Sequence, residues 1–287
     1  MNSETTAAGA RTRIMLLGID GLRWDLAADS PSAPTLRAMA AEGELRTMVM
    51  ETPTWSGPGW SSILTGTTHA EHGVVDNSFV GHKLFSKPDL LSRAFYQDQS
   101  TRTFAAAGWT PLVSPDGLGP VIHQRADQQK AGLHTVISRD GEVHGFVQID
   151  ADITDIALAA LTSNKVPDVS FLYFCDVDDA GHLHGARTAQ YQAALARVDR
   201  HIARVRSAVG DREEQFGENW LLVVVTDHGH LDEGGHGGDS PEERNSFVLR
   251  WQSSGSLTRW PDRVAPHEIA GLLLEERSRL EENVAGR

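Results

Sequence analysis

The sequence predicts an α/β fold in which a mostly parallel central sheet is sandwiched between helices, giving three layers, α/β/α. Three short apolar runs, at residues 13–19, 169–174 and 220–225, have the composition of strands buried on both faces. Stretches with helical spacing of apolar residues alternate with them along the chain. An aspartate follows each run: Asp20, Asp178 and Asp227. Ligands gather at this end of the strands in open α/β sheets.

The composition is that of a globular protein with a substantial core. Of 287 residues, 40% are hydrophobic and 23% are charged, so we expect one domain over residues 13–287 after a flexible polar tail at residues 1–12. No apolar run is long enough to span a bilayer, and the N-terminus lacks the apolar segment of a secretory signal. We therefore expect a cytoplasmic protein. The single cysteine, Cys175, excludes an internal disulfide framework.

The net charge of the chain restricts the kinds of molecule that we expect it to bind. The formal net charge is −13, which disfavours a nucleic acid polymer or an anionic membrane surface as a partner. A small anionic substrate would then need a local source of positive charge, such as metal ions. The oligomeric state is left open.

The expected elements follow the apolar periodicity and the turn residues. Strands are expected at residues 13–20, 45–50, 101–109, 169–174, 220–225 and 247–251, and helices at residues 30–43, 56–66, 89–97, 150–165, 188–209 and 265–277. Residues 79–145 are less regular, and we expect them to form the wall that faces a substrate. The histidines of this stretch, His134 among them, show no ligand spacing and are expected at the surface.

Ser56 is the candidate nucleophile. It precedes Gly57-Pro58, and proline is favoured in the first turn of a helix, so the helix should begin here and end at Gly66. The hydroxyl then lies at a helix N-terminus, where free N–H groups and the dipole favour an anion. The alternative is that Ser56 is an ordinary N-cap residue.

Metal-ligand residue types follow the second and third apolar runs. Asp178 and His182 stand four residues apart in what we expect to be a tight turn, and a solvated loop is the alternative to a metal site. Asp227 and His228 are adjacent, and His236 lies among four glycines. In a parallel sheet the three strand ends converge. Three carboxylates and three imidazoles around one hydroxyl suit two divalent cations. We expect these cations to be zinc, and the same ligands also accept manganese.

These residues resemble the alkaline phosphatase superfamily, and most closely its nucleotide pyrophosphatase/phosphodiesterase branch. The resemblance rests on five stretches in the order of the family: GIDGLRWDL, TPTWSGPGWSSILTGTTHAEHGVVDN, DVDDAGHLHG, VTDHGH and GGHGG. They extend from the first strand to His236 and imply an alkaline phosphatase-like fold.

The resemblance also implies roles for single residues. It implies that one zinc ion is held by Asp20, Asp227 and His228 and also binds the nucleophile Ser56. It implies that Asp178, His182 and His236 hold the second zinc ion. Asn77 lies 21 positions after Ser56, where the branch carries an asparagine that binds a phosphate oxygen.

Three positions differ from related patterns. The branch usually has threonine where this chain has Ser56. It has asparagine where this chain has Gly59, so the resemblance does not extend to substrate positioning by that residue. Trp60 occupies the position at which sulfatases of the superfamily need arginine, which argues against a sulfatase.

The sequence therefore predicts a two-metal phosphoester hydrolase with a phosphoseryl intermediate, acting on phosphodiester or nucleotide pyrophosphate bonds of a small anionic substrate. Trp55 and Trp60 flank Ser56 and could stack on the substrate, or both could be core anchors. A phosphomonoesterase, a phosphonate hydrolase and a non-catalytic metal-binding protein are the alternatives.

Overall fold

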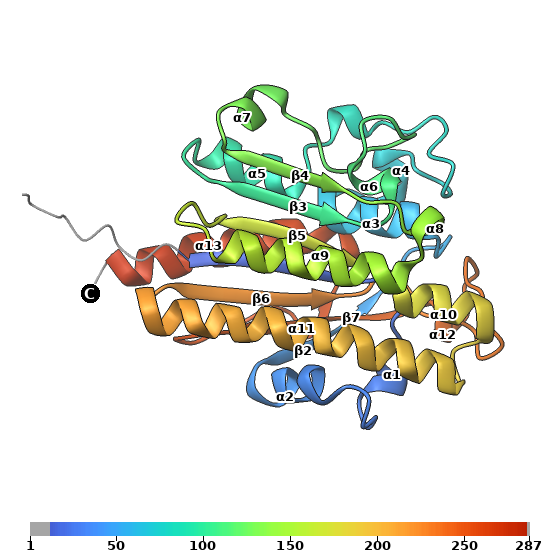
Figure 1. The fold of residues 1–287 in the computed structure, drawn as a ribbon. Helices are drawn as coiled ribbons and strands as arrows, with labels where there is room; N and C mark the ends of the chain where they lie inside the picture. Colours follow the sequence, from blue (N-terminus) through green and yellow to red (C-terminus); the bar gives the residue numbers. More distant parts are fainter. Residues whose placement is uncertain (1–11, 286–287) are drawn as a thin grey trace, which may run out of the picture.

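The computed structural model describes residues 12–285, with side chains as far as Leu280. The strands of this part of the chain form one sheet in the order β4-β3-β5-β1-β6-β7-β2-β8 (Figure 1). β7 is antiparallel to both of its neighbours, and all other pairs are parallel. The predicted mostly parallel sheet is confirmed.

The strands are β1 (Thr12–Ile19), β2 (Glu44–Val49), β3 (Thr103–Ala107), β4 (His134–Ser138), β5 (Val169–Phe174), β6 (Asn219–Val225), β7 (Asn245–Gln252) and β8 (Arg263–Val264). The longer helices are α2 (Pro34–Glu42), α3 (Ser56–Thr65), α5 (Leu90–Gln97), α9 (Phe146–Leu161), α10 (Asp176–His184), α11 (Ala189–Phe216) and α13 (Ile269–Ala285). The shorter ones are α1 (Trp24–Ala27), α4 (His69–His72), η1 (Leu84–Ser86), α6 (Thr110–Val113), α7 (Ala126–Lys130), α8 (Gly141–His144), α12 (Pro241–Arg244) and η2 (Pro266–Glu268).

Helices cover both faces of the sheet, which confirms the three layers. Successive residues of a strand point to opposite faces, so Met15 and Leu17 of β1 lie in one apolar core, whereas Ile14 and Leu16 lie in the other. The first core includes residues of α2, α9 and α11, and the second includes residues of α3, α5 and α13. Fully buried strands explain why the runs of β1, β5 and β6 are almost continuously apolar.

Two of the main elements differ from the sequence prediction. The segment after β5 is the helix α10 and not a tight turn, because its residues from Asp176 onward continue in helical hydrogen bonding as far as His184. β4 was not predicted. It pairs with β3 inside the stretch expected to be irregular, so this stretch extends the main sheet. The predicted tail lies outside the described residues except for Thr12, which begins β1.

Among the described residues, we find no helix with the length and apolar character required to cross a bilayer. The predicted cellular location stays a prediction.

His134 is buried and not at the surface as the sequence suggested. Its Nε2 lies 3.0 Å from the carbonyl oxygen of His123, and its Nδ1 lies 2.8 Å from Nη2 of Arg125. The ring therefore donates through Nε2 and accepts through Nδ1, which requires the neutral form. Burial and the neighbouring Arg125 lower the pKa of His134 from 6.5 to about 4.

We expect this histidine to make folding sensitive to acid. Between pH 6.5 and about 4 the unfolded chain binds a proton that the folded chain does not, so the free energy of unfolding decreases as the pH falls. The contribution is at most about 3 kcal/mol for a shift of this size. Urea unfolding over this pH range should show a shallower pH dependence for His134→Gln than for the wild type. An exposed control, His144→Gln, should retain the wild-type slope, and equal slopes for all three proteins would contradict the assignment.

Candidate active site

The carboxyl ends of three neighbouring strands carry the acidic residues of the site. β5, β1 and β6 lie side by side, and Gly18 of β1 pairs in register with Tyr173 and Val225 near the ends of the other two strands. The three strands therefore end at the same level, and the predicted convergence is confirmed. The aspartates brought together here are Asp20, Asp178 and Asp227, all of them buried.

Ser56 faces this acidic edge of the sheet. It is the first residue of α3, while Trp55 is the N-cap residue and its carbonyl accepts a hydrogen bond from the N–H of Gly59. No side chain caps the helix. The hydroxyl of Ser56 lies instead 3.1 Å from Nε2 of His228. Ser56 is thus not an ordinary N-cap residue.

The first candidate ligand group, as predicted from the sequence, consists of Asp20, Asp227 and His228. Nε2 of His228 lies 3.1 Å from Oδ1 of Asp20 and 3.3 Å from Oδ2 of Asp227. Neither of these two carboxylate oxygens, both buried, has a hydrogen-bond partner. Buried carboxylate oxygens without partners are costly unless a cation offsets them, so this group fits a divalent cation.

The pKa values of the first ligand group reflect the same excess of negative charge. Burial alone would lower the pKa of His228, but the carboxylates of Asp227 and Asp20 raise it from 6.5 to about 10. Burial and the charge of Asp20 together raise the pKa of Asp227 well above its ordinary value. The protonated ring of His228 thus supplies the positive charge that these carboxylates require when only protein groups are considered.

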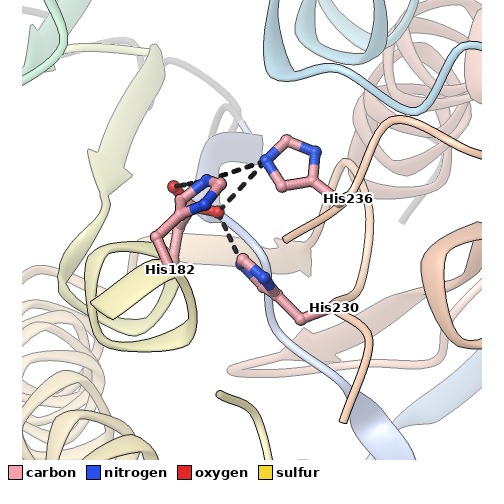
Figure 2. A group of neighbouring side chains, drawn as sticks. His182, His230 and His236 are labelled. Atoms are coloured by element: carbon pink, nitrogen blue, oxygen red, sulfur yellow. Dashed lines mark hydrogen bonds and ion pairs between the residues drawn. The ribbon is translucent and has the colours of Figure 1, made fainter. Parts of the chain in front are cut away.

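The second ligand group consists of Asp178, His182, His230 and His236. Their ligand atoms all lie within 4.8 Å of one another. Figure 2 shows the rings of His182, His230 and His236 converging from three sides. Nε2 of His182 lies 3.0 Å from Nε2 of His236 and 3.5 Å from Oδ2 of Asp178. Asp178 also lies within 4.8 Å of the ligand atoms of Asp20 and His228, so the two groups adjoin.

His230 is the member that the sequence analysis did not assign. Its Nε2 lies 2.7 Å from Oδ1 of Asp178, and its ring is buried. A Cβ added to Gly181 of α10 would come within 2.7 Å of this Nε2, so only glycine leaves room for the ring. The sequence did contain an indication of this role, because His230 follows Asp227-His228-Gly229 after β6, at the end of the strands where ligand residues gather.

Backbone carbonyls orient two of the imidazoles. Nδ1 of His236 lies 2.7 Å from the carbonyl oxygen of Thr54, and Nδ1 of His228 lies 3.0 Å from that of Gly229. Each Nδ1–H therefore donates to the backbone, and each Nε2 is left facing the site. Ligand histidines are commonly held in this way.

α10 places Asp178 and His182 on one face, since residues four apart in a helix are neighbours. Asp150 of α9 anchors the start of this helix. Its carboxylate is buried and accepts hydrogen bonds from the backbone N–H groups of Cys175 and Asp176, at 3.0 and 2.9 Å. Burial raises the pKa of Asp150 well above its ordinary value despite these bonds. No pattern in the sequence indicates that Asp150 of α9 contacts the first turn of α10.

Trp60 does not line the site. The sequence left open whether it stacks on the substrate or anchors the core. Its side chain is completely buried, and a Cβ on Gly18 of β1 would lie 2.5 Å from its Cη2. A substrate therefore cannot stack on it. Nε1 of Trp60 instead donates a hydrogen bond to Oδ2 of Asp20 at 2.8 Å, and the hydroxyl of Tyr173 donates to the same oxygen at 2.5 Å. These two donors fix the orientation of Asp20.

Asn77 lines the pocket beside Ser56, whereas Trp55 is partly exposed beside His236 but is not among the lining residues. Trp55 is 37% exposed, and its ring stands edge-on to that of His236 with centroids 5.3 Å apart. Oδ1 of Asn77 accepts a hydrogen bond from the N–H of Gly57 at 2.7 Å, which leaves its NH₂ group as a donor. Asn77, Ser56 and Asp178 line the same open pocket, whose volume is about 240 Å³.

Residues 14–270 match the family described as type I phosphodiesterase/nucleotide pyrophosphatase. The chain belongs to this family. The superfamily resemblance read from the sequence is thereby confirmed.

Known members of the family are distant in sequence. Human ectonucleotide pyrophosphatase/phosphodiesterase family member 7 is 24% identical over 285 residues, which are 95% of this chain but 58% of that protein. GPI ethanolamine phosphate transferase 1 of Yarrowia lipolytica is 26% identical over 86% of this chain and 28% of its own. The chain thus spans less than two thirds of either relative.

Two solved structures show the same fold. Murine ectonucleotide pyrophosphatase/phosphodiesterase 5, in complex with AMP, superposes with a TM-score of 0.65 at 15% identity, covering 93% of this chain and 95% of its own. Phosphonoacetate hydrolase from Sinorhizobium meliloti has a TM-score of 0.55 at 16% identity, covering 77% of this chain and 57% of its own.

We expect Trp60→Phe to weaken divalent metal binding, because Asp20 loses a donor that orients it while an aromatic ring still fills the core. Loss of such a supporting hydrogen bond typically lowers metal affinity roughly 10–100-fold. The measurement is a competition titration of zinc against a chromophoric chelator. Trp220→Phe is the matched control, because Trp220 is equally buried and its indole donates to Glu218, which directly precedes β6 at the end of the strands away from the site. Equal zinc affinities for both variants would contradict this role of Trp60.

Proposed function

We propose that this protein is a metal-dependent phosphoester hydrolase that uses Ser56 as its nucleophile. The observation that carries the proposal is the position of the Ser56 hydroxyl. It lies at the start of α3, 3.1 Å from His228 in the first ligand group, and it also lines the open pocket. A serine held between a group of cation ligands and a substrate-sized opening suits attack on phosphorus.

Two divalent ions, zinc or alternatively manganese, are the proposed cofactors. Asp20, Asp227 and His228 would hold one, and Asp178, His182 and His236 would hold the other. His230 either joins the second set or orients Asp178 through its hydrogen bond. Such ions supply positive charge that lowers the pKa of a nearby hydroxyl and offsets charge on phosphorus-bound oxygens.

The reaction takes place in two displacements at phosphorus. Ser56 loses its proton, and Oγ forms a bond to phosphorus while the bond to the leaving oxygen breaks and that oxygen takes up a proton. A water molecule then attacks the phosphoserine, the bond between phosphorus and Oγ breaks, and Ser56 regains a proton. The product is a phosphate ester with one substituent fewer than the substrate.

Asn77 is the proposed donor to a phosphate oxygen. Its Oδ1 is already occupied by the N–H of Gly57, so the NH₂ group is oriented by the same hydrogen bond. The N–H of Gly57, the second residue of α3, is therefore not free for the substrate, and the dipole of the helix contributes in its place. A donor held before the reaction begins stabilises developing charge without reorganisation.

The pocket favours a diester over a monoester. A monoester carries a third non-bridging oxygen, which would need another cation. Among the described residues, none of those that line this pocket is a lysine or an arginine. Residues 79–145 contribute Trp109 and Glu142 to the lining, which supports the predicted substrate-facing role of this stretch. Trp55 could stack on a substituent beside His236.

The names of the relatives give a range of phosphorus chemistry. They mention nucleotide pyrophosphates, phosphodiesters, ethanolamine phosphate and phosphonoacetate. A phosphonate hydrolase therefore remains the second candidate, supported by the shared fold with phosphonoacetate hydrolase. The retention of all the ligand residues argues against a non-catalytic metal-binding protein.

We expect the wild type to bind close to two zinc ions and His236→Ala to lose one, because His236 belongs to the second ligand group only. Metal analysis after reconstitution and removal of excess zinc measures this. His267→Ala, which changes a histidine outside both ligand groups, should retain the wild-type content. A folded protein without bound divalent ions would refute the proposed cofactors.

Ser56→Ala should lower the rate of hydrolysis of bis(p-nitrophenyl) phosphate by roughly 10³-fold or more, as expected when a nucleophile is removed. Its metal content should be unchanged, because each ligand group keeps three protein ligands. Ser61→Ala on the same helix is the matched control, since Ser61 is buried and its hydroxyl has no hydrogen-bond partner. Near-normal turnover by Ser56→Ala would rule out Ser56 as the nucleophile. A wild-type preference of tenfold or more for p-nitrophenyl phosphate would favour a phosphomonoesterase.

A further inference from the structure

His230 differs from His228 and His236 in the way its ring is held. In His228 and His236, Nδ1 donates a hydrogen bond to a backbone carbonyl, and Nε2 is left facing the site. Nδ1 of His230 is buried and has no hydrogen-bond partner among the described residues. The hydrogen bond of this ring is made by Nε2, which lies 2.7 Å from Oδ1 of Asp178.

These contacts determine which nitrogen of His230 carries the proton. With the proton on Nε2, the ring donates to the carboxylate of Asp178, and one lone pair on Nδ1 is left without a partner. With the proton on Nδ1, a buried N–H would lack an acceptor in the described part of the chain, and the lone pair of Nε2 would face a negative oxygen. A buried donor without an acceptor retains its full desolvation penalty, so the proton belongs on Nε2.

A metal ligand needs the opposite arrangement. A histidine binds a metal ion through an unprotonated nitrogen, and its other nitrogen ordinarily donates to a nearby acceptor. His228 and His236 meet this requirement through their backbone carbonyls. If His230 bound an ion through Nε2, its proton would move to the unpartnered Nδ1, and the hydrogen bond to Asp178 would be lost.

The tip of the His230 ring is enclosed by backbone. A Cβ built on Gly21 or on Gly181 would lie 2.7 Å from Nε2 in each case, so the tip lies between the segment after β1 and the helix α10. Gly21 follows Asp20 of the first ligand group, and Gly181 precedes His182 of the second. The ring therefore stands at the junction of the two groups.

A buried arginine holds the backbone of His230. Arg23 is 3% exposed, and its Nη1 donates to the carbonyl oxygen of His230 at 3.1 Å and to Oδ1 of Asp232 at 2.6 Å. The preceding residue, Gly229, donates its N–H to the carbonyl oxygen of Glu243 at 2.9 Å. Because Nδ1 makes no hydrogen bond within the described chain, these backbone contacts set the position of the ring.

We infer that His230 is a positioning residue, which holds Asp178 through its Nε2–H, and that it is not a fourth ligand of the second metal ion. The inference rests on the proposed function and deepens it. The carboxylate of Asp178 lies within 4.8 Å of ligand atoms in both ligand groups. A donor on Oδ1 fixes the rotation of this carboxylate, with Oδ2 3.5 Å from Nε2 of His182.

The number of protein ligands affects what the second ion can do. Zinc ions with four protein ligands are usually structural, whereas catalytic ions keep three and leave one position open. With His230 as a donor, the protein ligands of the second ion are Asp178, His182 and His236, and such a position is left. A hydrogen bond that orients a ligand from outside also strengthens metal binding.

Nitrogen-15 NMR of the zinc-loaded wild type tests the inference directly. Long-range proton–nitrogen correlation spectra distinguish protonated, unprotonated and metal-bound ring nitrogens, and comparison with His230→Gln identifies the signals of His230. We expect His230 to carry its proton on Nε2, with Nδ1 unprotonated. His228 and His236 should show the opposite tautomer, with Nδ1 protonated and Nε2 bound to zinc. A proton on Nδ1 of His230 together with zinc on its Nε2 would overturn the inference.

Two substitutions of His230 separate a donor from a ligand. His230→Gln keeps an N–H donor near the position of Nε2, whereas the matched control His230→Asn has a side chain one methylene shorter, which cannot reach Asp178. In a competition titration, we expect zinc affinity to fall roughly 10–100-fold in His230→Asn and to stay within about threefold of the wild type in His230→Gln. Both variants should still bind close to two zinc ions at saturation. An equally large loss of affinity in both would contradict a donor role.

The outcomes distinguish this inference from the proposed function. If the zinc-loaded wild type does not hydrolyse bis(p-nitrophenyl) phosphate, the proposed function fails, and the tautomer of His230 still decides the role of this residue. If the diester is hydrolysed while Nε2 of His230 binds zinc, the inference is overturned and the proposed function stands. A folded wild type that binds no zinc overturns both. A proton on Nε2 in the zinc-loaded protein, with zinc affinity retained in His230→Gln and lost in His230→Asn, supports the inference.

Discussion

Buried negative charge at one edge of the sheet is the constraint on which the rest of the site depends. Asp20 and Asp227 leave adjacent parallel strands and face the same imidazole, that of His228, while each keeps a carboxylate oxygen without a hydrogen-bond partner. Such an arrangement requires a compensating positive charge, which the imidazolium of His228 supplies within the protein and a bound metal ion would supply in its place. The surrounding structure orients these side chains through hydrogen bonds, as the two donors to Asp20 show.

The support around the ligands comes from distant parts of the chain. Trp60 of α3 and Tyr173 of β5 both donate to Asp20, and Asp150 of α9 holds the first turn of α10. Because α3 also carries Ser56, the indole of Trp60 links the position of the proposed nucleophile to that of Asp20. A tryptophan that looked like a substrate contact is in this way a positioning residue.

The pocket beside Ser56 is built from parts of the chain that are far apart in the sequence. Side chains of Trp109, Glu142, Phe146 and Asp179 reach it from the segments at α6, α8, α9 and α10. Among the described residues that line it there are carboxylates and aromatic rings but no lysine or arginine. The proposed attack by Ser56 on phosphorus places no demand on the ester group, so we expect this lining to select the substrate.

The sequence by itself determined the parallel sheet, the helix that begins at Ser56 and the six residues expected to bind metal, because apolar runs ending in aspartate and histidine are local patterns. It also contained His230, unassigned beside His228. Only the tertiary structure decided that Trp60 is buried and Trp55 is exposed, that Asp178 and His182 share a helix face, and that Glu142 reaches the pocket. Side-chain exposure and contacts between segments depend on packing between elements far apart in the chain, which periodicity along the sequence does not encode.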